Sequence, residues 1–206
     1  GSMIPADEAL ERLRDGNRRF VAELGRNAEL SSESRRRSLA TRQQPFAIIL
    51  GCSDSRVPAE LIFDQGLGDL FVIRVAGNIV APSQIDSVEF SAVLHRARLV
   101  VVLGHTQCGA ILSTIEALNQ PADDQARKLR SIVDRVRPSV EMLMETEVGK
   151  NRDELIRHSV RNNIRMSVNQ LRRGSAALER LIANEGLRVV GAEYSLETGI
   201  VEFLDH

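Results

Sequence analysis

The sequence predicts an α/β fold in which a mainly parallel central β-sheet, of about four core strands and a candidate terminal edge strand, is flanked by helices. Two observations support this prediction: apolar runs rich in β-branched residues recur along the chain, and amphipathic helical patterns separate them. Such runs are typical of strands buried on both faces, as in parallel sheets covered by helices. The length of 206 residues suits a single domain over residues 1–206, in which Gly1 and Ser2 look like a remnant of an expression tag.

The predicted core strands are four apolar runs, at residues 46–50, 70–75, 99–103 and 187–192. A terminal hairpin is predicted at residues 194–203 (YSLETGIVEF), because Thr198 and Gly199 form a typical turn between two short extended pieces.

Helical patterns account for most of the remaining chain. An N-terminal helical arm is expected over residues 6–43, with an amphipathic helix at 6–24 and a second helix at 32–43. The apolar face of the first helix must pack on its own domain or on a partner subunit. Further helices are expected at residues 83–98, 109–119 and 175–184, and in a charged stretch at 124–173 that Pro138 and Gly149 should divide.

The composition argues against several classes of protein. Lys plus Arg number 27 and Asp plus Glu number 28, a formal net charge of −1, so the chain lacks the basic field that attracts nucleic acid. Aromatic residues make up only 3%, with no Trp, which argues against surfaces that stack bases. Neither a membrane-length apolar run nor a secretory leader is evident. We therefore expect a cytoplasmic protein without nucleic-acid or membrane partners, and two cysteines in a chain of this size fit a reducing compartment.

Two of the predicted strands end in the same way. The strands at 46–50 and 99–103 are each followed by a glycine and then by a residue that can bind a metal, Cys52 in the first case and His105 in the second. Ligands of open α/β sheets bind at the carboxyl ends of the strands. We therefore expect Cys52 and His105 to lie close together at that edge.

Three further residues strengthen this site. An extended backbone would place Cys52, Asp54 and Arg56 on one side, and a spacing of three at the start of a helix turns His105 and Cys108 the same way. Two thiolates, one imidazole and one carboxylate are thus expected to converge. Thiolates with an imidazole suit zinc better than magnesium, calcium or manganese, so Zn²⁺ is the predicted cofactor.

The fourth zinc ligand decides what such a site can do. With Cys52, His105 and Cys108 bound, an open fourth position admits water and is typical of a catalytic site. With Asp54 as the fourth ligand the site is closed. Arg56 can hold Asp54 in a bidentate pair away from the metal, so the residues allow both states.

The motifs CSDSR (52–56) and HTQC (105–108), joined by IFDQGLGDLFVIRVAGN, resemble the β-class carbonic anhydrase family over about residues 46–110. The resemblance implies reversible hydration of carbon dioxide to bicarbonate and a proton by zinc-bound hydroxide. It implies Cys52, His105 and Cys108 as zinc ligands, with Asp54 and Arg56 as the catalytic dyad. It also implies N-terminal helices that pack on a neighbouring subunit, in a homodimer or homotetramer.

The resemblance also suggests substrate contacts. Gln65 matches a glutamine that, in one subgroup of the family, donates a hydrogen bond to substrate across the dimer interface, and Gly109 is a second expected substrate contact. Phe90 stands where that subgroup has a tyrosine, so the hydroxyl is missing here.

Another subgroup has a regulatory bicarbonate pocket made by a tryptophan, an arginine and a tyrosine. Arg74 and Tyr194 match two of these positions, but Ile49 stands at the tryptophan position. A closure of the site by Asp54, driven by pH or bicarbonate, therefore stays open as a hypothesis.

Two other functions compete with carbon dioxide hydration. The same zinc site could hydrolyse carbon disulfide or carbonyl sulfide, because attack on a linear triatomic molecule needs the same groups. Alternatively, the chain could be a non-catalytic zinc scaffold in which Asp54 permanently closes the site. Arg56 argues against the scaffold, because a purely structural site has no need of a cation beside its carboxylate.

Overall fold

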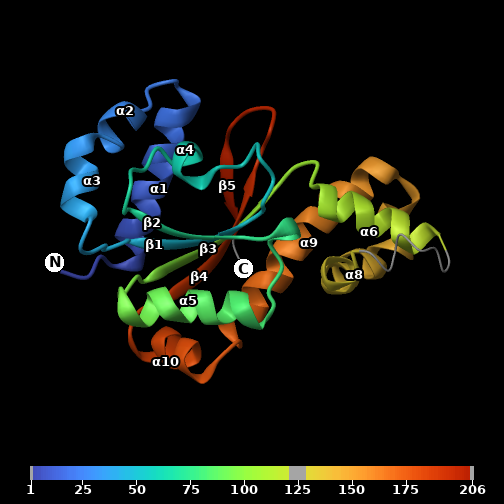
Figure 1. The fold of residues 1–206 in the computed structure, drawn as a ribbon. Coiled ribbons are helices and arrows are strands. Elements are labelled where there is room, and N and C mark those ends of the chain that lie inside the picture. The colour runs from blue at the N-terminus through green and yellow to red at the C-terminus, as the bar shows by residue number, and fades with distance from the viewer. Residues whose placement is uncertain (1, 121–128, 205–206) are drawn as a thin grey trace.

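A five-stranded sheet forms the centre of the structure, a computed structural model that describes residues 2–120 and 129–204 (Figure 1). The strands are β1 (Ala47–Gly51), β2 (Leu70–Arg74), β3 (Leu99–His105), β4 (Arg188–Tyr194) and β5 (Val201–Leu204). They lie in the order β2-β1-β3-β4-β5; the first four are parallel, and β5 is antiparallel to β4. The predicted sheet and terminal hairpin are thus confirmed, with the end of β4 as the first arm of the hairpin.

The register of the sheet brings the carboxyl ends of β1 and β3 together. Gly51, the last residue of β1, lies beside Leu103 of β3. His105 ends β3 and lies beside Tyr194 of β4. Cys52, which follows β1, therefore emerges next to the end of β3.

Helices cover both faces of the sheet (Figure 1). One face carries α1 (Ala6–Val21) and α4 (Ala59–Ile62). The other carries α5 (Pro82–Leu94), α9 (Arg152–Arg172) and α10 (Ala176–Asn184).

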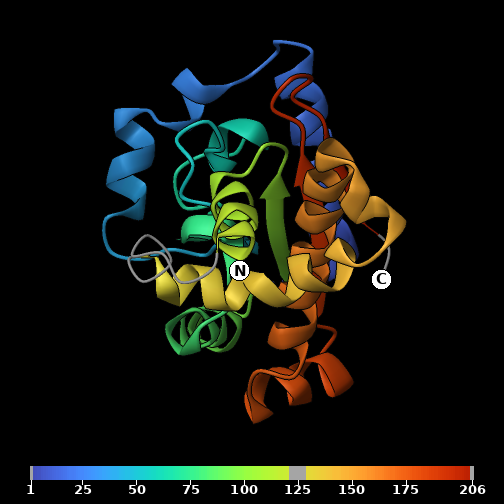
Figure 2. The same cartoon turned by 90° about the vertical axis from the view of Figure 1, so that its right-hand side faces the viewer.

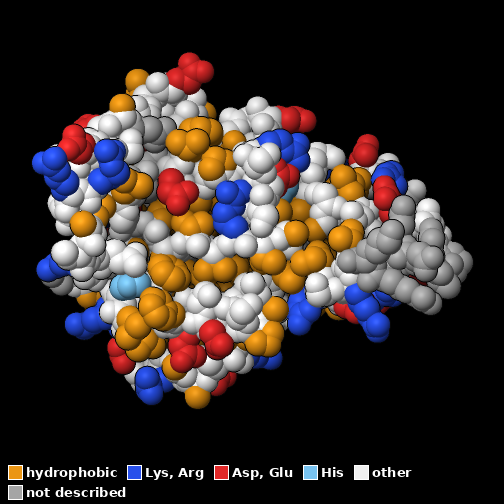
Figure 3. All heavy atoms as spheres, viewed as in Figure 1, with side chains coloured by type: hydrophobic (Ala, Val, Ile, Leu, Met, Phe, Trp, Pro, Cys, Tyr) orange, Lys and Arg blue, Asp and Glu red, His pale blue; other side chains and the backbone are white. Residues whose placement is uncertain are grey.

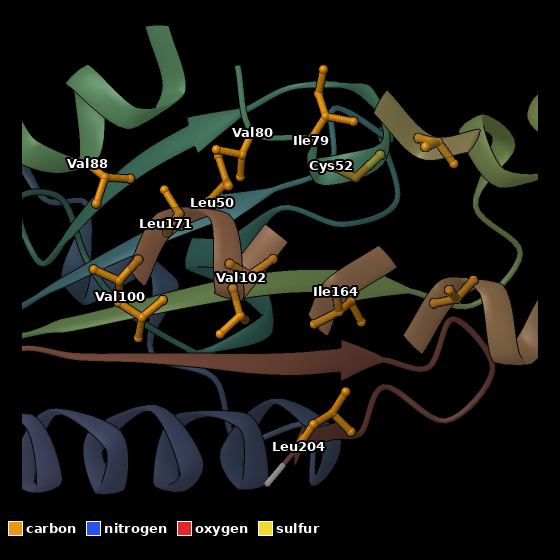
Figure 4. Close-up of a cluster of buried hydrophobic side chains, with 14 of the residues drawn as sticks. Leu50, Cys52, Ile79, Val80, Val88, Val100, Val102, Ile164, Leu171 and Leu204 are labelled. Carbon is orange, nitrogen blue, oxygen red and sulfur yellow. The ribbon is translucent and has the colours of Figure 1, made fainter. Parts of the chain in front are cut away.

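Successive residues of the central strands point to opposite faces. Ile49 and Val101 belong to the buried cluster beneath α1, whereas Leu50, Val100 and Val102 belong to the cluster beneath α5 and α9 (Figure 4). Because both faces are buried, these strands are continuous apolar runs instead of alternating patterns.

Two further helices, α6 (Gly109–Asn119) and α8 (Arg130–Met144), lie beyond the carboxyl ends of the strands, where α8 packs on both α6 and α9 (Figure 2). The prediction that Pro138 divides this stretch is wrong, because Pro138 lies inside α8. The same helix buries Val136 and Val140, and this burial offsets the hydrogen bond that a proline removes.

The predicted division at Gly149 is confirmed, because the 3-10 helix η2 (Glu147–Lys150) separates α8 from α9. Residues 124–128 of the predicted helical stretch lie outside the described residues. Within the described ranges, no helix is both long enough and apolar enough to span a bilayer.

Several helices end earlier than predicted. The helix expected at 83–98 ends at Leu94, and the helix expected at 6–24 ends at Val21. Arg96 and Glu23, just beyond these ends, have positive φ angles of 58° and 59°. A residue in the left-handed conformation ends a helix, and in a sequence such a residue is usually recognised as a glycine. Here the two residues are an arginine and a glutamate, so the sequence does not indicate where these helices end.

The N-terminal arm packs on its own chain in part. Leu10 and Leu13 of α1 are buried with Ile49 of the sheet. The rest of the arm, α2 (Asn27–Leu30) and α3 (Glu33–Leu39), follows, and no residue of α3 is buried. The sheet of the same chain thus covers the apolar face of α1, and packing of the arm on a partner stays a prediction.

The candidate metal centre

Three candidate metal ligands meet at the carboxyl ends of β1 and β3. Cys52 follows β1, His105 ends β3, and Cys108 precedes the first residue of α6. All three are buried, and their ligand atoms lie within 4.8 Å of one another. The convergence expected from the sequence is therefore present, because the parallel register places the two strand ends side by side.

The imidazole is oriented as a metal ligand requires. His105 Nδ1 lies 2.8 Å from the carbonyl oxygen of Thr106, and since a carbonyl only accepts, Nδ1 carries a hydrogen and Nε2 is the nitrogen left for a metal. The other nitrogen, Nε2, is buried and has no hydrogen-bond partner among the described residues. A buried imidazole lone pair facing two sulfurs is a donor set that fits zinc.

The two thiols shift each other's pKa values in opposite directions. A hydrogen bond from Cys108 lowers the pKa of Cys52 well below the usual thiol range, and His105 assists it. The contact with Cys52, together with burial, raises the pKa of Cys108. A divalent cation between the sulfurs would let both ionise, because its charge removes their mutual repulsion.

Asp54 and Arg56 form a bidentate pair beside these ligands. Arg56 Nε donates to Asp54 Oδ1 at 3.0 Å, and Arg56 Nη2 donates to Oδ2 at 2.8 Å. The same Oδ2 lies 3.8 Å from His105 Nε2. The hydrogen bond from the Arg56 side chain holds the pKa of Asp54 well below its usual range, so the carboxylate stays ionised.

Arg74 fixes the loop that carries Cys52 and Asp54. From the end of β2 it donates to the carbonyl oxygen of Cys52 at 2.9 Å and to that of Asp54 at 2.6 Å. Tyr194, which matches a second position of the regulatory pocket, and Ile49, which stands in place of its tryptophan, are buried in the cluster on the α1 side of the sheet. The hydrogen bonds of Arg74 thus support the loop that carries Cys52 and Asp54, a role that the sequence motifs did not indicate.

The expected substrate contacts lie in different places. Gly109 is the first residue of α6, directly after Cys108, and among the described residues no atom beyond its own helix backbone and chain neighbours lies within 4 Å of the position that a Cβ would take. This leaves open space beside a candidate metal ligand. Gln65 instead donates to the carbonyl oxygens of Phe63 at 2.9 Å and Arg12 at 3.4 Å, so its amide is turned toward α1. Phe90 lies on α5 with 49% of its surface exposed.

One contact at the site was missed by sequence reasoning. The backbone N–H of Gly77, in the 3-10 helix η1 (Ala76–Asn78), donates to Cys52 Sγ at 3.4 Å. Gly77 lies in the segment that joins the CSDSR and HTQC motifs, but no pattern in the sequence indicates that its N–H contacts the sulfur of Cys52.

Comparisons with known proteins agree with this geometry. A family model described as carbonic anhydrase matches residues 47–201. The chain is 40% identical over 200 residues to carbonic anhydrase 2 of Mycobacterium tuberculosis, covering 96% of this chain and 92% of that protein. It is 39% identical over 199 residues to a carbonic anhydrase of Mycolicibacterium smegmatis, covering 96% and 93% respectively.

A solved structure extends the comparison to the fold. The β-carbonic anhydrase CafA of Aspergillus fumigatus superimposes with a TM-score of 0.72 at 27% identity, covering 82% of this chain and 79% of that one. The resemblance seen in the motifs is thus confirmed over most of the chain, and the chain belongs to the β-class carbonic anhydrase family.

Proposed function

We propose that this chain catalyses the reversible hydration of carbon dioxide to bicarbonate and a proton, with zinc held by Cys52, His105 and Cys108. The observation that carries the proposal is the meeting of three ligand atoms within 4.8 Å, beside a carboxylate that Arg56 holds. Both cysteines are free thiols, which fits an enzyme of the cytoplasm.

When bound, zinc would supply a Lewis acid that lowers the pKa of a coordinated water, less strongly with two anionic thiolates than with three neutral imidazoles. Ionised Asp54 can accept a hydrogen bond from the reacting water and so turn an oxygen lone pair toward carbon dioxide. Arg56 keeps that carboxylate charged and occupies both of its oxygens. The open space at Gly109 would admit the substrate, whereas Gln65 would have to give up its bond to Phe63 to donate to substrate across a dimer interface.

The ion pair between Asp54 and Arg56 also argues against the alternative of a non-catalytic zinc scaffold. A permanently closed site would need Asp54 to turn an oxygen onto the metal, whereas here a bidentate pair with Arg56 orients both oxygens toward that side chain. This supports an enzyme over a structural zinc site.

We expect the hydration rate to rise between pH 6 and pH 9, about two to five units above the ordinary carboxyl pKa of about 4. Asp54 cannot cause this rise, because its pKa is lowered and it is ionised throughout. Stopped-flow hydration of carbon dioxide, with zinc analysis of the same sample, tests the proposal. A flat profile would contradict it, and turnover of carbon disulfide without hydration of carbon dioxide would favour the sulfur substrates.

We also propose that the chain forms a homodimer or homotetramer through β2 and the outer side of α5. In the described sheet β2 is an edge strand, paired only with β1, and so presents unpaired backbone groups. Hydrophobic side chains gather over β2 and α5 on this face (Figure 3). Phe90 stacks on Phe71 of β2 at a ring distance of 5.9 Å, and Leu94 is 63% exposed. A second copy would cover this apolar surface and the open edge.

Light scattering should therefore give a mass at least twice the 22.8 kDa of one chain. Leu94→Asp should lower that mass, because a charge would be buried at the interface. Met142→Asp, at an equally exposed apolar residue of α8, is the matched control and should leave it unchanged. A monomeric wild-type protein would refute the assembly.

A further inference from the structure

We infer that α9 positions the metal centre, through Asn163 and Ser167, which hold the backbone whose N–H donates to Cys52. The inference rests on the proposed zinc site. Both residues lie far along the chain from the ligand motifs and contact no ligand directly; their effect would pass through Gly77 and Asn78 of η1.

The backbone of η1 is unusual at this point. Gly77 has φ 71° and ψ 15°, and Asn78 has φ 42°, so two consecutive residues are left-handed. Asn78 N donates to the carbonyl oxygen of Val75 at 3.0 Å, which closes the start of the turn. A left-handed non-glycine residue is unfavourable, so other contacts must hold the pair in this conformation.

Two side chains of α9 provide those contacts. Asn163 Nδ2 donates to the carbonyl oxygen of Gly77 at 2.8 Å, and Ser167 Oγ donates to that of Asn78 at 2.9 Å. The two residues are one helical turn apart and therefore share a face of α9. Asn163 is itself oriented from α8, because Ser139 Oγ donates to its Oδ1 at 3.3 Å. All three side chains are buried, so water cannot replace these bonds.

The same face of α9 also lies against the strand that carries His105. A Cβ at Gly104 would come within 2.5 Å of Ile164 Cδ1, so the glycine permits this close approach (Figure 4 shows Ile164 over β3). One helix therefore sets the position of two elements: the end of β3 and the turn that donates to Cys52.

The N–H of Gly77 then has a defined effect on the sulfur. A hydrogen bond to a thiolate lowers the energy of the sulfur lone pairs and fixes their direction toward the metal. If Asn163 or Ser167 is removed, the turn should relax and the bond to Cys52 Sγ should lengthen. The metal should then bind less tightly, and the absorption band of thiolate-to-metal charge transfer should move to longer wavelength.

The chain offers a matched pair of variants to test this. Ser167 and Ser159 are both buried in α9, 2% and 0% exposed, and Ser159 Oγ has no hydrogen-bond partner among the described residues. Ser167→Ala and Ser159→Ala therefore remove the same atom from the same helix, with and without a bond to η1. Asn163→Ala is the stronger variant. Each full-length protein is stripped of metal and titrated with Co²⁺, and its Zn²⁺ affinity is measured against a competing chelator.

We expect Asn163→Ala to weaken Zn²⁺ binding about 10- to 100-fold, with a smaller loss for Ser167→Ala, and the Co²⁺ band to shift to longer wavelength in both. Ser159→Ala should match wild type in both readouts. If Asn163 and Ser167 had only a structural role, their removal would lower the stability of the metal-free protein, measured by urea unfolding, without shifting the Co²⁺ absorption band. The role of α9 would be refuted if the Co²⁺ spectra of Ser167→Ala and Asn163→Ala were identical to that of Ser159→Ala; the proposed metal centre would still stand. A wild-type protein that binds no Co²⁺ would refute the metal centre itself.

Discussion

His105→Ala is expected to lose stoichiometric zinc and to reduce carbon dioxide hydration to near the uncatalysed rate. The imidazole is one of the three ligands of the proposed centre, and its Nε2 has no hydrogen-bond partner among the described residues. Two thiolates without it cannot complete the set that a catalytic zinc site requires. The loss in rate should be several orders of magnitude, because the ion supplies the reactive nucleophile. Zinc analysis and stopped-flow hydration of the purified variant are the measurements.

His158→Ala is the control for this experiment. The His158 side chain is 52% exposed on α9 and, within the described part of the chain, pairs with Glu154 of the same helix at 3.3 Å. Its removal should leave zinc content and rate at wild-type values. A His105→Ala protein that is folded by circular dichroism, holds a full equivalent of zinc and hydrates carbon dioxide at the normal rate would rule out the proposed centre.

Asp54→Ala is expected to keep zinc and to lose about 10²- to 10⁴-fold in turnover, the usual contribution of a group that handles a proton in the transition state. Asp54 contacts the reacting water in our proposal but is not one of the three ligands. Arg56→Ala should also retain zinc and lose activity, but for another reason. Without Arg56 the Asp54 carboxylate is free to bind the metal, because its Oδ2 already lies 3.8 Å from His105 Nε2.

The double variant separates these two effects. If Arg56 acts only through Asp54, then Asp54→Ala/Arg56→Ala should be no slower than Asp54→Ala alone, since coupled residues are not additive. Asp15→Ala is the matched control, because Asp15 pairs with Arg18 at 2.6 Å on the exposed side of α1 and should have no effect on turnover. Full activity of Asp54→Ala would refute the catalytic role.

The strands and the ligands could be predicted from the sequence because both are local signals. A strand buried on two faces is a run of Val, Ile and Leu, and such a run followed by a glycine and a cysteine or histidine marks a site at its carboxyl end. Cys52 and His105 meet as expected, because parallel strands of similar length end at one edge.

The errors came from contacts that are distant in sequence. Pro138 is compatible with a helix only because Val136 and Val140 pack on neighbours that the local pattern does not reveal. Asn163 and Ser167 look like ordinary polar residues of a charged helix until the fold places them against η1. The left-handed Glu23 and Arg96 likewise carry no signal of the kind that glycine gives.

The placement of the three proposed ligands after two different strands has a consequence for the order of events in folding. His105 and Cys108 are near neighbours in sequence, but Cys52 reaches them only after β1 and β3 have paired across an intervening crossover. Closing so long a loop costs chain entropy, which the pairing of the strands helps to offset. The nascent chain can therefore offer a metal only two donors until its sheet is assembled, so ion capture becomes a late event that reports a completed fold.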